Sequence, residues 1–84
     1  PNSFQSNLRL AKILYKQEKL EQARGILESI VEEANKPEGY LWLGLVLYKS
    51  NNKHRAKEAW EKAYFMDPNN PTIQAYRDQV KGHS

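Results

Sequence analysis

Two stretches of this chain, thirty-three residues apart, repeat one another in residue type. Leu8–Ala11 aligns with Leu41–Gly44, and Leu14–Lys16 aligns with Leu47–Lys49. A repeat at a period of roughly 20–50 residues indicates a stack of small units, because a single unit cannot bury its own apolar face. The repeat therefore predicts a solenoid and points to recognition rather than chemistry.

The spacing of the apolar residues predicts helices. They recur in three- and four-residue steps over segments that begin near Leu8, Leu20, Tyr40 and Ala56, and a last amphipathic stretch runs from Ile73 to Val80. No run alternates with the period of two that a strand needs. We therefore predict an all-α fold, an α-solenoid of antiparallel helix hairpins with five helices.

Helix-breaking residues separate these segments. Asn35-Lys36-Pro37 ends the second segment, because the residue before a proline avoids the helical region. The run from Asp67 to Pro71 is the strongest breaker in the chain. These boundaries divide a single domain, residues 1–84, into a first repeat (4–36), a second repeat (37–70) and a last helix (71–82) that caps the array or begins a third repeat.

The second unit places small and large apolar residues at fixed positions of its two helices. They are Tyr40, Leu43, Gly44, Ala56, Trp60 and Ala63, and the run Asp67–Asn70 follows them. On these positions the unit resembles the tetratricopeptide repeat, a family of helical hairpins with small residues where helices cross closely. We therefore expect Gly44 to face Ala56 and Ala63 to meet the last helix, on which Tyr76 and Val80 pack inward. The first unit fits the same pattern more loosely, with Glu18 in place of the usual glycine at the turn.

No catalytic or metal chemistry is expected. The chain has no cysteine, and its two histidines, His54 and His83, stand in separate segments with no reason to meet. The pair Glu32-Glu33 stands beside no histidine, whereas metal sites need clustered ligands. The four glycines are scattered and form no phosphate-binding loop. We expect no enzyme activity, no cofactor and no metal.

The chain also lacks an apolar run of the roughly 20 residues that a membrane-spanning helix needs. Its longest, Tyr40 to Tyr48, is far too short, so no membrane insertion is expected. The chain starts at Pro1 without a methionine, which is typical of a fragment of a larger protein or of a processed form. A cytoplasmic location is expected.

Charge is divided unevenly between the helices of the first unit. Residues 4–17 carry three bases and no acids, whereas residues 20–34 carry four acids and one base. In proteins that resemble this family, the first helix of each unit lines a concave groove and the second forms the convex back. The resemblance therefore implies an aromatic and aliphatic groove with a basic border, made of Leu8, Lys12, Tyr15, Lys16, Leu41, Trp42, Leu45, Tyr48 and Lys49.

This groove predicts a non-catalytic adaptor that binds a peptide or helix of a partner protein, with apolar anchors and acidic flanks. Lys12, Lys16 and Lys49 would steer the acidic partner, while apolar burial supplies most of the affinity. Leu41, Trp42 and Leu45 are equally consistent with packing against neighbouring helices. The lysine and asparagine clamp with which some family members hold a terminal carboxylate is absent.

Two other functions stay open. Since two repeats are few, the module would stack its exposed end, near Phe4 and Leu8, on another copy or on the rest of a longer protein. Lysines beside Tyr15 and Trp42 also suit single-stranded nucleic acid. However, the chain has ten acids against thirteen bases, and interleaved charges of this kind usually mark a solvated helix face. Nucleic-acid binding is therefore the weaker interpretation.

Overall fold

The computed structural model describes the backbone of residues 3–82 and the side chains of residues 3–79. The predicted inward packing of Val80 and the position of His83 lie outside the described residues. Residues 3–82 form five helices and no strand, which confirms the predicted all-α fold. The helices are α1 (Ser3–Lys16), α2 (Leu20–Glu33), α3 (Pro37–Lys49), α4 (Lys53–Met66) and α5 (Pro71–Gly82).

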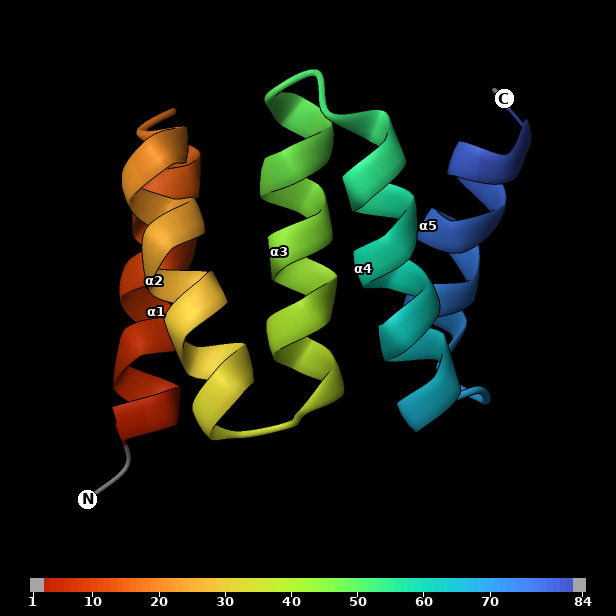
Figure 1. Ribbon diagram of the computed structural model, residues 1–84, viewed down its shortest axis with the longest axis horizontal. Coiled ribbons are helices and arrows are strands. Elements are labelled where there is room, and N and C mark those ends of the chain that lie inside the picture. Colours follow the sequence, from red (N-terminus) through yellow and green to blue (C-terminus); the bar gives the residue numbers. More distant parts are fainter. Residues whose placement is uncertain (1–2, 83–84) are drawn as a thin grey trace.

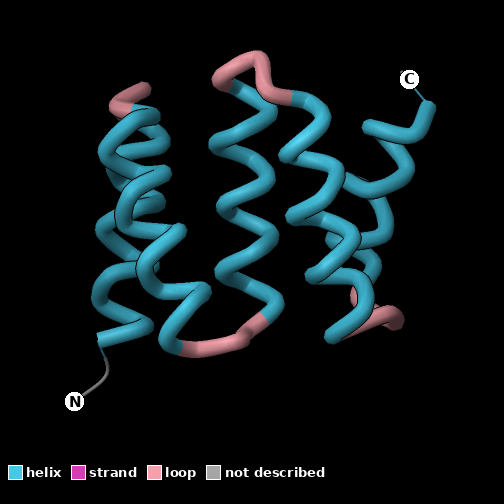
Figure 2. Tube along the Cα trace, viewed as in Figure 1, coloured by secondary structure: helices cyan, strands magenta, loops and turns pink. Residues whose placement is uncertain are grey.

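Each helix packs on the next one along the chain, and α1 also contacts α3. The connecting loops alternate between the two ends of the molecule (Figure 2), so α1, α3 and α5 run in one direction and α2 and α4 in the other. In Figure 1, α2 and α4 lie in front of α1 and α5, with α3 between the pairs. One face of the molecule is therefore built on α2 and α4, and the opposite face on α1, α3 and α5.

A continuous apolar core joins the helices. Trp60 of α4 is its largest fully buried side chain, and α5 adds Ile73, which is equally buried. The helices contribute Leu8, Ala11, Leu14, Ala23, Leu27, Ile30, Val31, Leu43, Val46, Leu47, Ala56, Ala59, Trp60, Ala63 and Ile73.

At the crossing of α3 and α4, the side-chain atoms nearest to Gly44 belong to the indole ring of Trp60, whereas the sequence pattern predicted Ala56 there. A Cβ atom on Gly44 would collide with the indole ring of Trp60. That ring is held in place, since it is 1% exposed and its Nε1–H donates to the carbonyl oxygen of Leu41 at 3.0 Å. Glycine is needed at position 44 because the indole lies directly against the backbone of α3.

The turn of each hairpin places one residue in the left-handed region, at Glu18 (φ 63°) and at Asn51 (φ 67°). The following amide of Lys19 donates to the carbonyl of Leu14 at 2.9 Å and closes the end of α1. Asn tolerates this conformation better than Glu, because its short polar side chain can hydrogen-bond to the nearby backbone. The first hairpin therefore keeps the turn geometry of the second without the usual glycine.

Replacing Glu18 with glycine is expected to raise the free energy of unfolding by about 0.5–1 kcal/mol, because glycine adopts positive φ without a Cβ conflict. In a domain of this size the melting temperature would rise by roughly 2–8 °C. Thermal unfolding followed by circular dichroism measures the shift. Asn51→Gly is the matched control, with a smaller gain. A melting temperature lowered by Glu18→Gly would contradict the strain assigned to this turn.

Candidate functional site

A hollow of about 350 Å³ is lined mainly by side chains of α1, α3 and α5. Its walls come from helices that are neighbours only in the folded chain, since α1 and α5 are more than fifty residues apart in the sequence. Trp60 of α4 closes the inner side. We call this hollow the aromatic groove, and it is lined by Tyr15, Leu45, Tyr48, Lys49, Trp60, Tyr76 and Gln79.

Aromatic rings from four helices contact one another along the groove. Trp60 stacks on Tyr76 with ring centroids 5.3 Å apart and lies 5.7 Å from the ring of Tyr48. Tyr15 meets Trp42 edge to face at 5.6 Å. Because Trp60 is buried and hydrogen-bonded, it holds the rings of Tyr48 and Tyr76 in fixed positions. The groove therefore offers a pre-formed aromatic surface.

Lysine ammonium groups lie over these rings. Nζ of Lys12 is 5.3 Å from the Trp42 centroid, and Nζ of Lys49 is 5.3 Å from the Tyr15 centroid. Such exposed cation–π contacts contribute about 0.5–1 kcal/mol each. No carboxylate among the described side chains forms an ion pair with Lys12, Lys16 or Lys49. The positive charge beside the groove is thus not compensated by an ion pair with any described side chain.

Six of the nine residues predicted to bind a partner lie in or beside the aromatic groove. Lys12 and Trp42 adjoin it, through the ring contact between Trp42 and Tyr15. The other four line it, and they are Tyr15, Leu45, Tyr48 and Lys49.

The remaining three predicted residues do not line the groove. Leu41 is half-buried and packs against the core, and Lys16 is exposed in the last turn of α1. Leu8 is 1% exposed and offers no surface to a partner, which corrects its assignment to the groove. Leu8 is buried together with Ala11 and Leu14, whereas Lys12 and Tyr15, which share its face of α1, are covered only in part.

Three groove residues were missing from the predicted set, namely Trp60, Tyr76 and Gln79. A signal for Tyr76 exists in the sequence, because it stands thirty-four residues after Trp42, one repeat length along. Extending the repeat onto α5 would have added it. For Trp60, which carries the family resemblance, the sequence gives no indication that its ring also reaches the groove.

Metal and membrane features are not found in the described part of the chain. Within it, no three side chains of His, Cys, Asp or Glu are grouped so that they would hold a metal ion. None of the described helices combines the length and the apolar character required to cross a membrane. His54 is exposed and has only Glu58 beside it, at 3.4 Å.

Sequential antiparallel hairpins on one shared core define a helical-repeat protein. A tetratricopeptide repeat model matches residues 37–70, and a second one matches residues 5–34. The chain belongs to the tetratricopeptide repeat family, with two repeats and a fifth helix consistent with a cap. No curated protein shows a significant match. Repeats of this family are generally protein–protein interaction modules and are typically non-catalytic.

Proposed function

We propose that this chain is a non-catalytic adaptor that binds a short segment of a partner protein in the aromatic groove. The observation that carries the proposal is a hollow of about 350 Å³ with pre-positioned tyrosines and an unpaired lysine at its edge. Tyrosine and tryptophan supply large contact areas at low cost in conformational entropy and dominate interaction hot spots.

The chemistry of the groove favours an apolar anchor beside an acidic flank. An apolar side chain in the hollow would bury surface against Tyr48, Tyr76 and Leu45. Lysine ammonium groups already lie over the rings of Tyr15 and Trp42, so a cationic side chain of the partner would be repelled by them. A carboxylate next to the anchor would instead be attracted to Lys12 and Lys49. The bound segment would be helical or extended.

The test uses peptides selected from a displayed random library against the wild-type chain, with association and dissociation rates measured separately. Lys49→Glu is expected to lower the association rate of acidic peptides, with a loss that shrinks at high salt, because edge charges act by screened steering. Tyr48→Ala is expected to raise the dissociation rate by about tenfold or more, the size expected for an aromatic anchor. Circular dichroism checks that helicity is retained.

Lys57→Glu, at an exposed position of α4, is the matched control for charge reversal and should leave these peptides bound. The proposal fails if Lys57→Glu abolishes binding while the changes at Lys49 and Tyr48 do nothing. The interaction surface would then lie on the face of α2 and α4.

We propose self-association or stacking on a neighbouring domain as a second candidate, and the outer face of α1 favours it. Leu10 and Ile13 are 45% and 47% exposed, one turn apart. The predicted contact near Phe4 and Leu8 is replaced by this pair, because Leu8 is buried and Phe4 lies beneath Lys36, whose Nζ is 4.8 Å from the ring. A dimer in sedimentation equilibrium that Leu10→Ser dissolves would support the candidate, and a concentration-independent monomer would exclude self-association.

A further inference from the structure

A second groove crosses the face built on α2 and α4, with α3 as its floor. It consists of two adjoining hollows of about 410 and 80 Å³ that share lining residues on α3 and α4. The floor is apolar, because Leu43 is buried there and Tyr40 is half-buried beside it. We call this site the charged groove, and the residues that define it are Glu28, Glu32, Tyr40, Leu43, Arg55 and Lys62.

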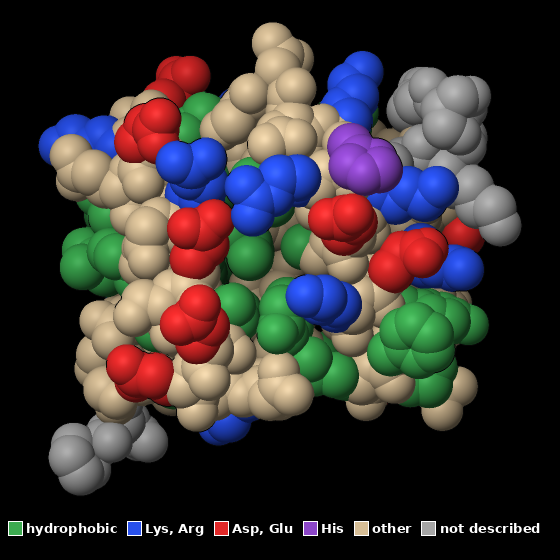
Figure 3. Space-filling view, in the orientation of Figure 1, with side chains coloured by type: hydrophobic (Ala, Val, Ile, Leu, Met, Phe, Trp, Pro, Cys, Tyr) green, Lys and Arg blue, Asp and Glu red, His purple; other side chains and the backbone are tan. Residues whose placement is uncertain are grey.

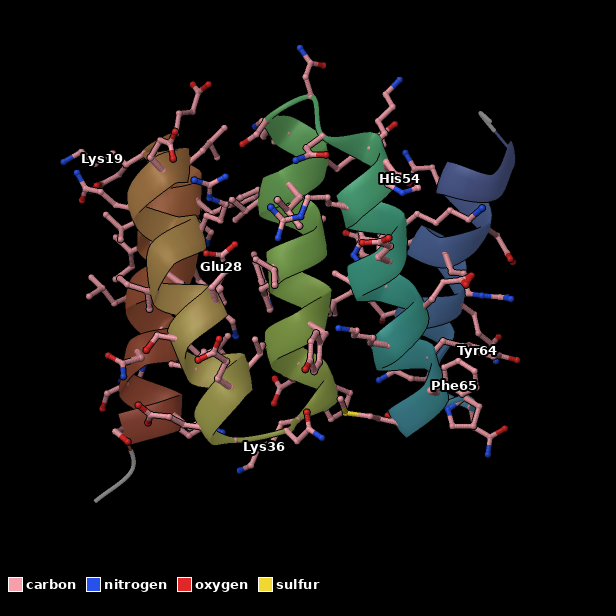
Figure 4. All side chains as sticks on the ribbon, in the orientation of Figure 1. Lys19, Glu28, Lys36, His54, Tyr64 and Phe65 are labelled. Carbon is pink, nitrogen blue, oxygen red and sulfur yellow. The ribbon has the colours of Figure 1, made fainter. Side chains whose placement is uncertain are left out.

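The two walls of the charged groove differ in charge. Glu28 and Glu32 stand on α2, whereas α4 carries the bases Arg55 and Lys62 with one acid, Glu58, between them. Figure 3 shows acidic side chains over α2, hydrophobic ones between α2 and α4, and basic ones mixed with acidic ones over α4. Figure 4 shows Glu28 reaching from α2 towards α3, into the space between the walls. The α2 wall is thus purely acidic in its charged residues, whereas the α4 wall carries two bases and one acid.

Contacts within the chain satisfy these charges only weakly. Arg55 Nη2 and Glu28 Oε2 are 3.7 Å apart, beyond hydrogen-bond distance, and both side chains are about half exposed. Exposed pairs of this kind contribute little to stability, so the bridge across the groove opens at small cost. Lys62 lies over the Tyr40 ring at 5.6 Å, and no base among the described side chains pairs with Glu32. These charged groups remain available to a ligand.

We propose that the charged groove docks an amphipathic segment of a partner protein, in addition to the segment bound on the opposite face. Its apolar side chains would rest on Tyr40 and Leu43, its basic side chains would face Glu32 on α2, and an acidic side chain would face Lys62 on α4. The opposite orientation would place like charges together, so the polarity of the walls sets the direction in which the segment lies. The partner therefore differs in charge pattern from the acidic one proposed for the aromatic groove.

The test uses a displayed library of helical peptides with a constant apolar stripe and randomised flanks, selected on the wild-type chain. Enriched peptides are expected to include a class with one basic and one acidic flank. Its affinity should fall on the order of tenfold with Glu32→Lys, since attraction is exchanged for repulsion, and should stay unchanged with Lys49→Glu. Peptides of the aromatic groove should show the reverse pattern, so the two proposals fail separately. Thermal melting checks that Glu32→Lys is folded.

A reciprocal exchange sharpens the test. A peptide whose basic flank is changed to glutamate should no longer bind the wild-type chain, but it should bind the Glu32→Lys variant. The proposal is overturned if no enriched class is sensitive to Glu32→Lys, or if the exchanged peptide does not recover. It is also overturned if sedimentation shows a dimer that Arg55→Glu dissolves, because a second copy of the chain would then cover this face.

Discussion

Replacing Gly44 with alanine is expected to lower the free energy of unfolding by about 2–3 kcal/mol, although alanine is the better helix former. The added Cβ would collide with the buried indole of Trp60. Overpacking costs about 1–3 kcal/mol, and displacement of the ring would break its hydrogen bond to Leu41, at a further cost of roughly 1–3 kcal/mol. The gain in helix propensity, about 1 kcal/mol, offsets only part of this loss.

Gly25 provides a matched control for the same chemical change. It lies in the interior of α2, and a Cβ there would meet nothing within 4 Å. Gly25→Ala is therefore expected to stabilise the chain by about 0.5–1 kcal/mol. Urea unfolding of both variants measures the two effects. A change of the same sign in both would mean that the indole of Trp60 does not press on Gly44.

Ending the chain at Asn70, and so removing α5, is expected to cost at least about 3 kcal/mol and to promote aggregation. Ile73 is 1% exposed, and Tyr76 stacks on Trp60 at 5.3 Å, so both would leave apolar surface of α4 uncovered. An end helix is needed in a solenoid, because a terminal unit has no neighbour on its outer side. Thermal melting and sedimentation of the shortened chain measure the loss.

Two point variants test whether the contacts of α5, rather than the length of the chain, stabilise the protein. Ile73→Ala should cost about 2–5 kcal/mol, as for other large-to-small changes in a core. Asp78→Ala, at an exposed position of the same helix, should change stability by less than about 0.5 kcal/mol. A shortened chain that melts as the wild type does and stays monomeric would contradict the capping role of α5.

The sequence by itself determined the architecture and part of the aromatic groove. A period of thirty-three residues and three- to four-residue apolar spacing are local patterns, and they indicated the hairpins without knowledge of their packing. The resemblance to the tetratricopeptide repeat implied the groove positions of Tyr15, Tyr48 and Lys49, and equivalent residues of stacked units reach the same face. The position of a residue in one repeat can thus be used to predict the position of its equivalent in the next repeat.

Only the tertiary structure decided which residues meet across units. Leu8 and Tyr15 are seven residues apart and share one face of α1, yet Leu8 is buried and Tyr15 lines the groove, because the neighbouring helices cover the two turns differently. Tyr76 joins Trp60, and Glu32 faces Lys62 across the charged groove, through stacking of separate helices. Such pairs depend on helix rotation and crossing geometry, which side-chain packing sets and one-dimensional spacing does not contain.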